Sequence, residues 1–395
     1  MDKMLEAIKP FFLHNYCMYV NELGVSFAHH GETYQRGIGG IRMENKIKYL
    51  RSIFTLVALF SFGIITTNAT ADQSGLKIPE QVTGDLAYTH VYFLSEEIGA
   101  REVKTSQEEE TADYIVEQFE GMGYDVEIQP FDFVRQETTY YSENIIATKH
   151  GKFDQTVIVG AHYDSVSERV CEDDINQVST GAGDNASGLG VMLEVAEILA
   201  NYKTLGTIKF IAFGAEEVGL RGSSYYAGQM SDEDIANTVT MIDLDSVGVG
   251  DFFYVYAGLD DNPGWARDLA LNIGQRIGHD LRTSPQSEYF DWGTTGDWSD
   301  HVPFKNLGIP IAYFEWMNWD IEPDGGIETE EYGWVMHTCM DNLSFISHDK
   351  LELTAEVVAA LVFELSKTKL PKAEKGRIAK GNKYISIQKR YYPSN

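Results

Sequence analysis

The chain is poor in cysteine, with only 3 in 395 residues. A scaffold held together by a dense disulfide framework is therefore excluded, and hydrophobic packing must supply the stability. The apolar content suffices for this, because 43% of the residues are hydrophobic and 12% are aromatic. Cys17 precedes the export signal described below, which leaves Cys171 and Cys339 in the exported chain. These two cysteines form either one disulfide or two separate buried thiols.

Positive charge is also scarce, since 31 Lys and Arg face 60 Asp and Glu, and the formal net charge is −29. So acidic a protein repels the negatively charged phosphates of a nucleic acid, which excludes nucleic-acid partners. The exception is the segment 367–395, which has nine Lys and Arg and one acidic residue, Glu374. Three roles stay open for this basic tail: folding against the acidic body, binding an anionic envelope, or forming a solvated end.

A long apolar run is missing as well, and only Ile53–Ile65 approaches one. Basic residues precede this run, and Ala69 and Ala71 place small side chains at the two positions that a signal peptidase reads. The run is too short to cross a bilayer comfortably. We therefore predict a secretory signal peptide that starts at Met43, a secreted, periplasmic or cell-envelope location, and no stable membrane insertion of the mature chain. The alternative is an anchor that the mature protein retains.

This signal divides the chain into four predicted parts. No repeat and no low-complexity linker cuts the long part after the signal in two, so it is predicted to form one domain. The first part precedes the true initiator and is interpreted as the product of a start codon placed too far upstream. The parts are the upstream extension 1–42, the signal peptide 43–71, the folded domain 72–366 and the basic tail 367–395.

Strand and helix patterns alternate along the folded domain. Segment 156–165, "TVIVGAHYDS", is a continuous apolar run, which is typical of a central strand covered on both sides. Alternation of this kind predicts an α/β domain with a mixed, mostly parallel sheet and helices on both faces. Ser106 and Glu109 are predicted to form a capping box. The predicted strands are 124–133, 142–149, 156–165, 207–215, 238–248 and 308–316, and the predicted helices are 78–99, 106–123, 184–202, 223–230, 263–277 and 351–365.

Acidic residues and histidines gather where these predicted strands end, and in such sheets the carboxyl ends of the strands form the site. Buried carboxylates in this number do not stay ionised without cations beside them, so a divalent metal is expected. Imidazole and carboxylate ligands suit zinc, with cobalt or manganese as replacements. The sequence lacks HExxH, CxxC and GxSxG motifs, which excludes the familiar single-zinc, thiolate and serine-nucleophile designs. The candidates are His162, Asp164, Asp184, Glu216, Glu217, Asp243, Asp245 and His337.

The sequence contains six short motifs in this order: "GAHYDS", "GAGDNASG", "FGAEEVGLRGS", "DLDSVG", "SDHVPFKNLGIP" and "HTCMDN". Each motif alone is weak, but the ordered set is specific. Together the motifs resemble metallopeptidase family 28, the co-catalytic di-zinc aminopeptidases, and the resemblance covers about 95–365. It implies a zinc-dependent exopeptidase fold, peptide substrates, and a peptidase domain over 72–366.

The resemblance also implies a set of ligands for two zinc ions. His162 and Asp245 would hold one ion, Glu217 and His337 would hold the other, and Asp184 would bridge them.

Three further acids near these ligands receive their roles from the same resemblance. Asp243 competes with Asp245 as a ligand, but Asp245 directly precedes "SVG" and fits the pattern better. Asp164 would hold the imidazole of His162 in its metal-binding tautomer, or it is a surface loop acid. Glu216 would be the general base, which takes a proton from the attacking water and passes it to the leaving amine.

The sequence departs from the family pattern at the residue before the last histidine. Relatives have a nearby tyrosine that polarises the carbonyl, but Met336 stands here, and Tyr332 and Tyr313 are the candidate substitutes. Asp300 and His301, in "SDHVPF", either shape the substrate pocket or form structural hydrogen bonds.

The resemblance predicts a secreted zinc aminopeptidase that removes N-terminal residues from peptides. Three rival functions remain: a single-zinc glutaminyl cyclase of the same fold, a carboxypeptidase or dipeptidase of the same clan, and a binding protein without catalysis. A carboxypeptidase would need a basic pocket for a free carboxylate, and few Arg or Lys lie near the motifs. A binding protein would usually have lost ligands, whereas every ligand position is filled here.

Overall fold

The structure is a computed structural model that describes residues 82–166, 179–258, 263–283, 297–321 and 327–367. The predicted upstream extension and signal peptide, the basic tail after Lys367, and also Cys171 lie outside the described residues, so the statements about them stay predictions. The chain divides into two units, and all described residues belong to the second, 68–395.

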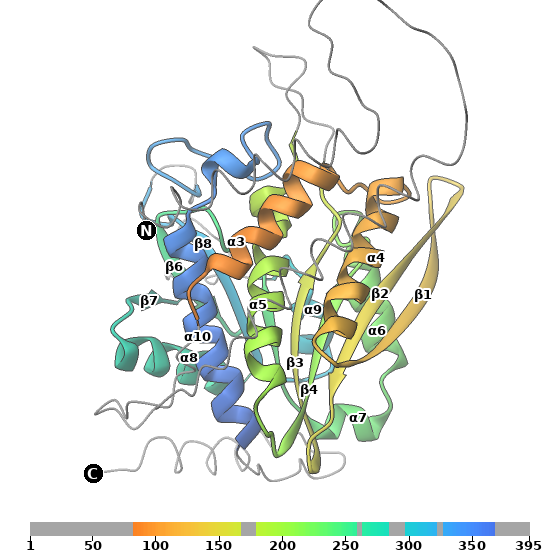
Figure 1. The fold of residues 1–395 in the computed structure, drawn as a ribbon, viewed down its shortest axis with the longest axis vertical. Helices are drawn as coiled ribbons and strands as arrows, with labels where there is room; N and C mark the ends of the chain where they lie inside the picture. The colour runs from red at the N-terminus through yellow and green to blue at the C-terminus, as the bar shows by residue number, and fades with distance from the viewer. Residues whose placement is uncertain (1–81, 167–178, 259–262, 284–296, 322–326, 368–395) are drawn as a thin grey trace, which may run out of the picture. The chain divides into compact units, whose positions relative to one another are not determined.

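A mixed eight-stranded sheet forms the centre of the fold, with the strand order β1-β2-β4-β3-β5-β8-β6-β7 (Figure 1). The central neighbours β4, β3, β5 and β8 run parallel to one another, as do β6 and β7. The pairs β1–β2, β2–β4 and β6–β8 are antiparallel. The predicted mixed, mostly parallel sheet is confirmed. The strands are β1 Asp125–Arg135, β2 Thr138–Lys149, β3 Phe153–His162, β4 Gly206–Phe213, β5 Thr238–Leu244, β6 Phe252–Tyr256, β7 Leu281–Arg282 and β8 Ile311–Met317.

Helices cover both faces of this sheet, as the sequence predicts. Helices α3, α4, α5, α8 and α10 pack on the face that carries the larger apolar cluster, and α6, α7 and α9 pack on the other (Figure 1). The helices are α3 Asp85–Tyr92, η1 Phe93–Ile98, α4 Ser106–Gly121, η2 Ala182–Ser187, α5 Gly188–Ala200, α6 Arg221–Gln229, α7 Asp232–Asn237, α8 Trp265–Ile277, α9 His301–Asn306, η3 Leu343–Phe345 and α10 His348–Lys367.

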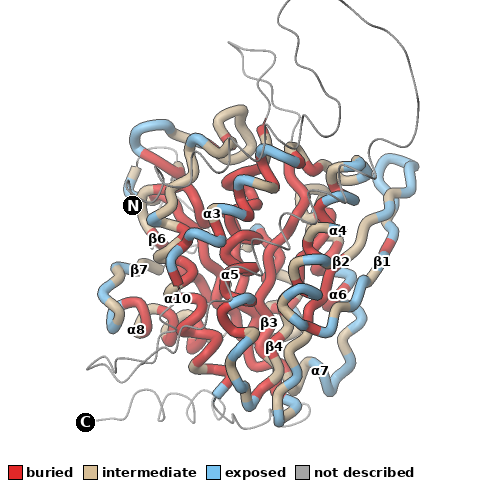
Figure 2. Tube along the Cα trace, in the orientation of Figure 1, coloured by how far each residue is buried: buried red, intermediate tan, exposed pale blue. Residues whose placement is uncertain are grey.

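The core lies between α5 and the central strands. The apolar run of β3 is buried on both faces, and Val159 pairs with Phe210 of β4 in the parallel register. Figure 2 shows buried residues concentrated in α5, β3 and β4, with exposed residues along β1 and α7. This distribution explains why continuous apolar runs mark the central strands, whereas the edge strand β1 alternates in polarity.

The start of α4 differs from its prediction. The N-cap is Thr105, whose side chain accepts a hydrogen bond from the backbone N–H of Glu108. The carboxylate of Glu108 in turn accepts a hydrogen bond from the backbone N–H of Lys104. Reciprocal capping therefore forms one residue earlier than expected, and the predicted capping box of Ser106 and Glu109 is wrong.

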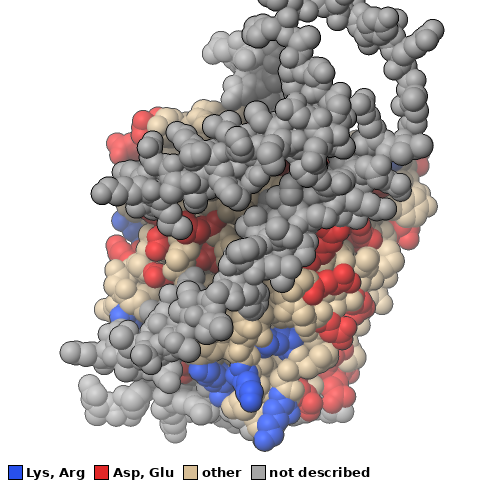
Figure 3. Space-filling view, viewed as in Figure 1, with Lys and Arg blue, Asp and Glu red and all other residues tan. Residues whose placement is uncertain are grey.

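The described residues include no helix that is both long enough and apolar enough to cross a bilayer. Figure 3 shows acidic side chains spread over the described part of one face, with basic side chains gathered along its lower edge. The acidity of the sequence is thus visible on this surface.

Candidate metal centre

The candidate site lies where the parallel strands β4, β3 and β5 end. His162 is the last residue of β3, and Asp245 directly follows the last residue of β5. After β4, a tight turn with Ala215 at φ +58° leads to Glu216 and Glu217. Because carboxyl ends of parallel strands meet at one edge of the sheet, residues up to 83 positions apart converge there.

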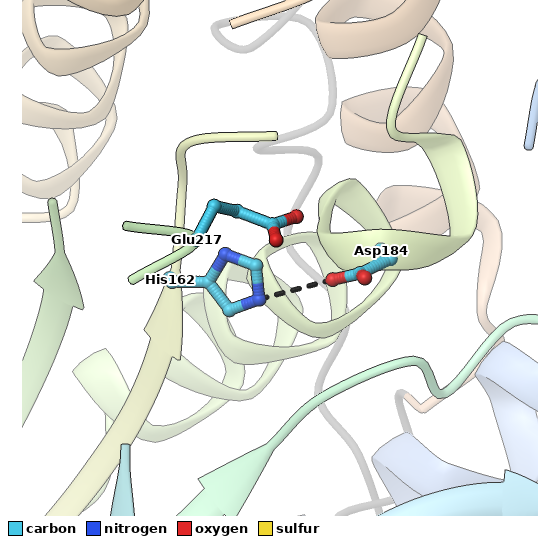
Figure 4. Close-up of side chains that lie close together, drawn as sticks. All are labelled: His162, Asp184 and Glu217. Atoms are coloured by element: carbon cyan, nitrogen blue, oxygen red, sulfur yellow. Dashed lines mark ion pairs between the residues drawn. The ribbon is translucent and has the colours of Figure 1, made fainter. Parts of the chain in front are cut away.

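Two further residues reach the site from outside the sheet. Asp184 lies in η2, which precedes α5, and His337 lies in a loop between β8 and α10. The two carboxylate oxygens of Asp184 face different histidines: Oδ1 is 3.0 Å from Nε2 of His162, and Oδ2 is 2.9 Å from Nε2 of His337. Oε2 of Glu217 is 3.1 Å from the same nitrogen of His337. Figure 4 shows His162, Asp184 and Glu217 pointing toward one another from three elements.

Asp245 also lies against His162, whereas Asp243 does not. Oδ1 of Asp245 is 3.5 Å from Nε2 of His162. Oδ2 of Asp243 instead accepts a hydrogen bond from the backbone N–H of His301 at 2.8 Å, and lies 3.0 Å from Nδ1 of that ring. The geometry therefore separates the two aspartates that competed in the sequence.

The carboxylate of Glu216 lies slightly apart from the other groups. Its Oε2 is 4.0 Å from Nε2 of His162. Burial raises the pKa of Glu216 well above its usual range; His162 opposes this shift, and the charges of Asp300 and Asp245 add to it. The surroundings of Glu216 thus disfavour its ionised form.

Negative charge dominates the electrostatics of the other site residues. Burial, then the charge of Asp184, raises the pKa of Glu217 to about 7. Burial lowers the pKa of His162, but the carboxylates of Glu216 and Asp245 outweigh it and hold that pKa well above its usual value. Hydrogen bonds with Asp184 and Glu217 raise the pKa of His337 to about 11. A site with these properties is stabilised by added positive charge.

These residues fit a zinc ion. Potential ligand atoms of His162, Asp184 and Glu217 all lie within 4.8 Å of one another. Nε2 of His162 has Asp184 Oδ1 at 3.0 Å, but neither it nor Oε1 of Glu217 makes a hydrogen bond of good geometry among the described residues, and both atoms are buried. Imidazole nitrogen and carboxylate oxygen are ligand types that zinc takes in proteins, and a bound cation would satisfy both buried atoms.

Asp164 contacts the site in two ways. Its backbone carbonyl oxygen lies 3.1 Å from Nδ1 of His162, and its carboxylate Oδ1 lies 3.6 Å from the same nitrogen. The carboxylate also accepts the backbone N–H groups of Glu216 and Glu217, at 2.9 and 3.1 Å. Asp164 is fully buried, so it is not a surface loop acid.

Arg101 is a site residue that the sequence reasoning missed. Its side chain is fully buried and donates hydrogen bonds to the carbonyl oxygens of Tyr163, Thr180 and Gly181 at 2.7 to 2.8 Å. It therefore ties the end of β3 to the loop that leads into Asp184. Its only sequence signal is an isolated basic residue in an acidic stretch, which does not reveal such contacts.

Asp341 supports Asp184 from the other side. Its Oδ1 accepts the backbone N–H of Gly183 at 2.5 Å, and its Oδ2 accepts that of Asp184 at 3.3 Å. The motif "HTCMDN" contains Asp341, but its role follows only from the fold.

Three of the remaining candidates, Tyr313, Tyr332 and His301, have structural contacts, whereas both carboxylate oxygens of the buried Asp300 lack a hydrogen-bond partner among the described residues. Tyr313 is buried and donates its hydroxyl hydrogen to Glu315 at 2.6 Å, whereas Tyr332 is exposed and packs edge-on against Phe345. The ring of His301 stacks on Tyr313 with centroids 4.5 Å apart.

Cys339, two residues after His337, is disulfide-bonded. Cys171 lies outside the described residues, so its pairing with Cys339 stays a prediction.

Comparison with known proteins places this site in a family. Residues 144–362 match the model of peptidase family M28. The chain is 36% identical over 246 residues to aminopeptidase YwaD of Bacillus subtilis, covering 60% of this chain and 48% of that protein. It is 32% identical over 261 residues to the alkaline phosphatase isozyme conversion protein of Escherichia coli, covering 62% of this chain and 76% of that protein. The match thus spans about half the length of the Bacillus relative.

Solved structures share the fold. A zinc aminopeptidase from Bacillus subtilis superposes with a TM-score of 0.60 at 23% identity, covering 73% of this chain and 96% of that chain. Porphyromonas gingivalis glutaminyl cyclase superposes with a TM-score of 0.57 at 24% identity, covering 72% and 99%. The family model covers more than half of the 395 residues. The chain therefore belongs to peptidase family M28.

Proposed function

We propose that this chain is an exported, zinc-dependent aminopeptidase that hydrolyses N-terminal residues from peptides at a site for two zinc ions. In this proposal His162 and Asp245 would hold one ion, Glu217 and His337 would hold the other, and Asp184 would be shared by the two sets of ligands. Cobalt or manganese would be able to replace zinc.

One observation carries the proposal: the two oxygens of Asp184 face two different histidines, at 3.0 and 2.9 Å. A carboxylate shared in this way between two imidazoles is suited to bridge two cations. Each histidine also has a second acid beside it, Asp245 for His162 and Glu217 for His337. The donors thus fall into two sets that share Asp184.

Glu216 is the proposed general base. Zinc held here would polarise the scissile carbonyl and make a water molecule more acidic. Glu216 would accept a proton from the attacking water and later deliver it to the leaving amine. Its carboxylate lies 4.0 Å from Nε2 of His162, farther than those of Asp184 and Asp245, which would leave it free to handle a proton.

Asp164 positions this base. Its carboxylate accepts the backbone N–H groups of both Glu216 and Glu217. Asp164 would thereby keep the base, Glu216, and the neighbouring zinc ligand, Glu217, at fixed positions relative to each other. Its backbone carbonyl would also fix the His162 ring so that Nε2 faces the metal.

The relatives support the peptidase interpretation, because YwaD is described as an aminopeptidase and the superposed Bacillus structure as a zinc aminopeptidase. Glutaminyl cyclase is the rival, since its structure has the same fold. The donor pair of Asp245 and His162, in addition to that of Glu217 and His337, favours two metal ions over one.

The test is a peptide panel with and without a chelator, combined with a measurement of zinc content. We expect about two zinc ions per chain, and chelator-sensitive release of single residues from peptides with free amino ends. Cleavage of peptides with blocked amino ends would contradict the aminopeptidase proposal. Cyclisation of N-terminal glutamine without peptide hydrolysis would favour the rival. Export is tested separately by sequencing the amino end of the natural protein, which should begin after Ala71.

A further inference from the structure

His337 differs from most of the other proposed ligands because it does not follow a strand of the sheet. It lies in a loop, and its backbone has a φ of +55°, in the left-handed region that few residues other than glycine adopt. His162 has the Asp164 carbonyl 3.1 Å from its second ring nitrogen. The side-chain contacts of His337 run through Nε2, which faces Asp184 and Glu217. The position of the His337 ring therefore depends on the backbone of its loop.

That backbone is held by the buried carboxylate of Glu328. Oε2 of Glu328 accepts hydrogen bonds from the backbone N–H groups of Val335 and Met336, both at 2.5 Å. These are the two residues directly before His337. Glu328 is only 1% exposed, so water does not compete for these bonds. The carbonyl of Val335 is also bound, because it accepts from the N–H and the hydroxyl of Thr338.

Glu328 is itself fixed to the sheet. Its carbonyl oxygen accepts from the backbone N–H of Asp251, at 2.9 Å, just before β6 begins. The preceding residue, Ile327, exchanges two backbone hydrogen bonds with Asn318 at the end of β8, at 2.6 and 2.9 Å. The backbone N–H of Glu330 donates to the Asp251 carboxylate at 2.7 Å. The carboxylate of Glu328 is thus aimed from a rigid base at the loop of His337.

We propose that Glu328 is a positioning residue for metal binding, which holds the 335–337 backbone so that the His337 imidazole points at Asp184 and Glu217. This inference rests on the proposed role of His337 as a zinc ligand. It gives a function to the acidic stretch 327–333, whose buried glutamate braces the metal site while neighbouring acids such as Glu330 face solvent.

The test compares Glu328→Ala and Glu328→Gln with Glu330→Gln in the full chain. Glu330 is a matched control because its side chain is exposed and only its backbone takes part in the anchor. Burial raises the pKa of Glu328 to about 8, so its neutral acid form is accessible near neutral pH. An amide at this position, which keeps one acceptor oxygen, is therefore a close mimic.

The readout is the zinc that each variant retains against graded concentrations of a chelator, measured beside the urea stability of the metal-free protein. Removing an outer partner of a metal ligand typically weakens metal affinity by about 10- to 100-fold. We expect a loss of this size for one zinc ion in Glu328→Ala, a smaller loss in Glu328→Gln, and none in Glu330→Gln. In cobalt-substituted protein, the visible spectrum of Glu328→Ala should differ from that of the wild type.

Two results would overturn the proposal. One is a Glu328→Ala protein that folds and binds zinc as tightly as the wild type. The other is a Glu328→Gln protein that loses as much zinc affinity as Glu328→Ala, since the acceptor oxygen would then be irrelevant. Failure of the aminopeptidase proposal is recognised separately, because it appears in the wild-type protein as absent zinc or absent peptide hydrolysis.

Discussion

Replacing Glu216 by glutamine tests the proposed chemistry most directly. The substitution keeps the size of the side chain and its backbone contact with Asp164, but it removes the group that binds a proton. Oε2 of Glu216 is 4.0 Å from His162, whereas Asp184 approaches the same nitrogen to 3.0 Å. The variant should therefore retain its zinc, because the five proposed ligands are unchanged.

The expected loss is large and confined to turnover. A general base contributes about 10²- to 10⁴-fold to the rate, which equals about 2.7 to 5.4 kcal/mol of transition-state stabilisation. Most of this loss should appear in kcat, since Glu216 is proposed to act on the proton of the attacking water. Two measurements on the same sample test this prediction: the rate of hydrolysis of an aminoacyl chromogenic amide, and the zinc content of the protein.

Glu217→Gln is the matched control, because it makes the same chemical change one residue later. Glu217 lies 3.1 Å from His337 and is a proposed ligand, so this variant should lose zinc as well as activity. A Glu216→Gln protein with near-normal turnover would refute the assignment of the base. A Glu216→Gln protein that has lost zinc while Glu217→Gln keeps it would show that the two roles are reversed.

Three further predictions concern buried polar groups outside the ligand set. Arg101→Met leaves the buried carbonyls of Tyr163, Thr180 and Gly181 without their donor, and should lower the free energy of unfolding by about 3 kcal/mol or more in urea titrations. The side chain of Glu194, in α5, accepts hydrogen bonds from the backbone N–H groups of Thr83, Gly84 and Ala87. Glu194→Gln loses one acceptor oxygen, so it should lower the free energy of unfolding by about 1 to 3 kcal/mol and speed amide exchange at the start of α3. Burial raises the pKa of Glu108 from 4.5 to about 7, so its contribution to stability is greatest below pH 4.5 and declines as the pH rises to 7. Glu108→Gln should remove this decline, which is of the order of 3 kcal/mol, in urea titrations at several pH values; equal pH profiles for variant and wild type would contradict it.

The sequence predicts the sheet and the convergence of the site residues because both depend on local patterns. Continuous apolar runs identify the central strands, and polar residues directly after those runs identify the edge where His162, Glu217 and Asp245 meet. Strand β6, Phe252–Tyr256, is absent from the prediction. It is only five residues long, and its place beside β8 depends on pairing between distant segments.

The supporting contacts escape prediction for a different reason. Arg101, Asp341 and Glu328 act on backbone groups, and any residue can supply a backbone N–H or carbonyl. The sequence therefore indicates neither which backbone group such a side chain binds nor how far along the chain that group lies. An acidic segment that contains Glu328 looks like a solvated loop until the fold buries one of its carboxylates.

The adjacent glutamates Glu216 and Glu217 show how the fold turns an unfavourable sequence into a useful one. Two neighbouring carboxylates at a buried strand end repel each other and lose solvation. The turn at Ala215 lets both backbone N–H groups point at one acceptor, the carboxylate of Asp164. The two side chains then diverge: Glu217 faces His337, and Glu216 stays beside His162. A single buried aspartate, Asp164, thus fixes the backbone of both the proposed ligand and the proposed base. Because the two glutamates are adjacent in the sequence, this one carboxylate is enough to hold their side chains at constant positions relative to each other.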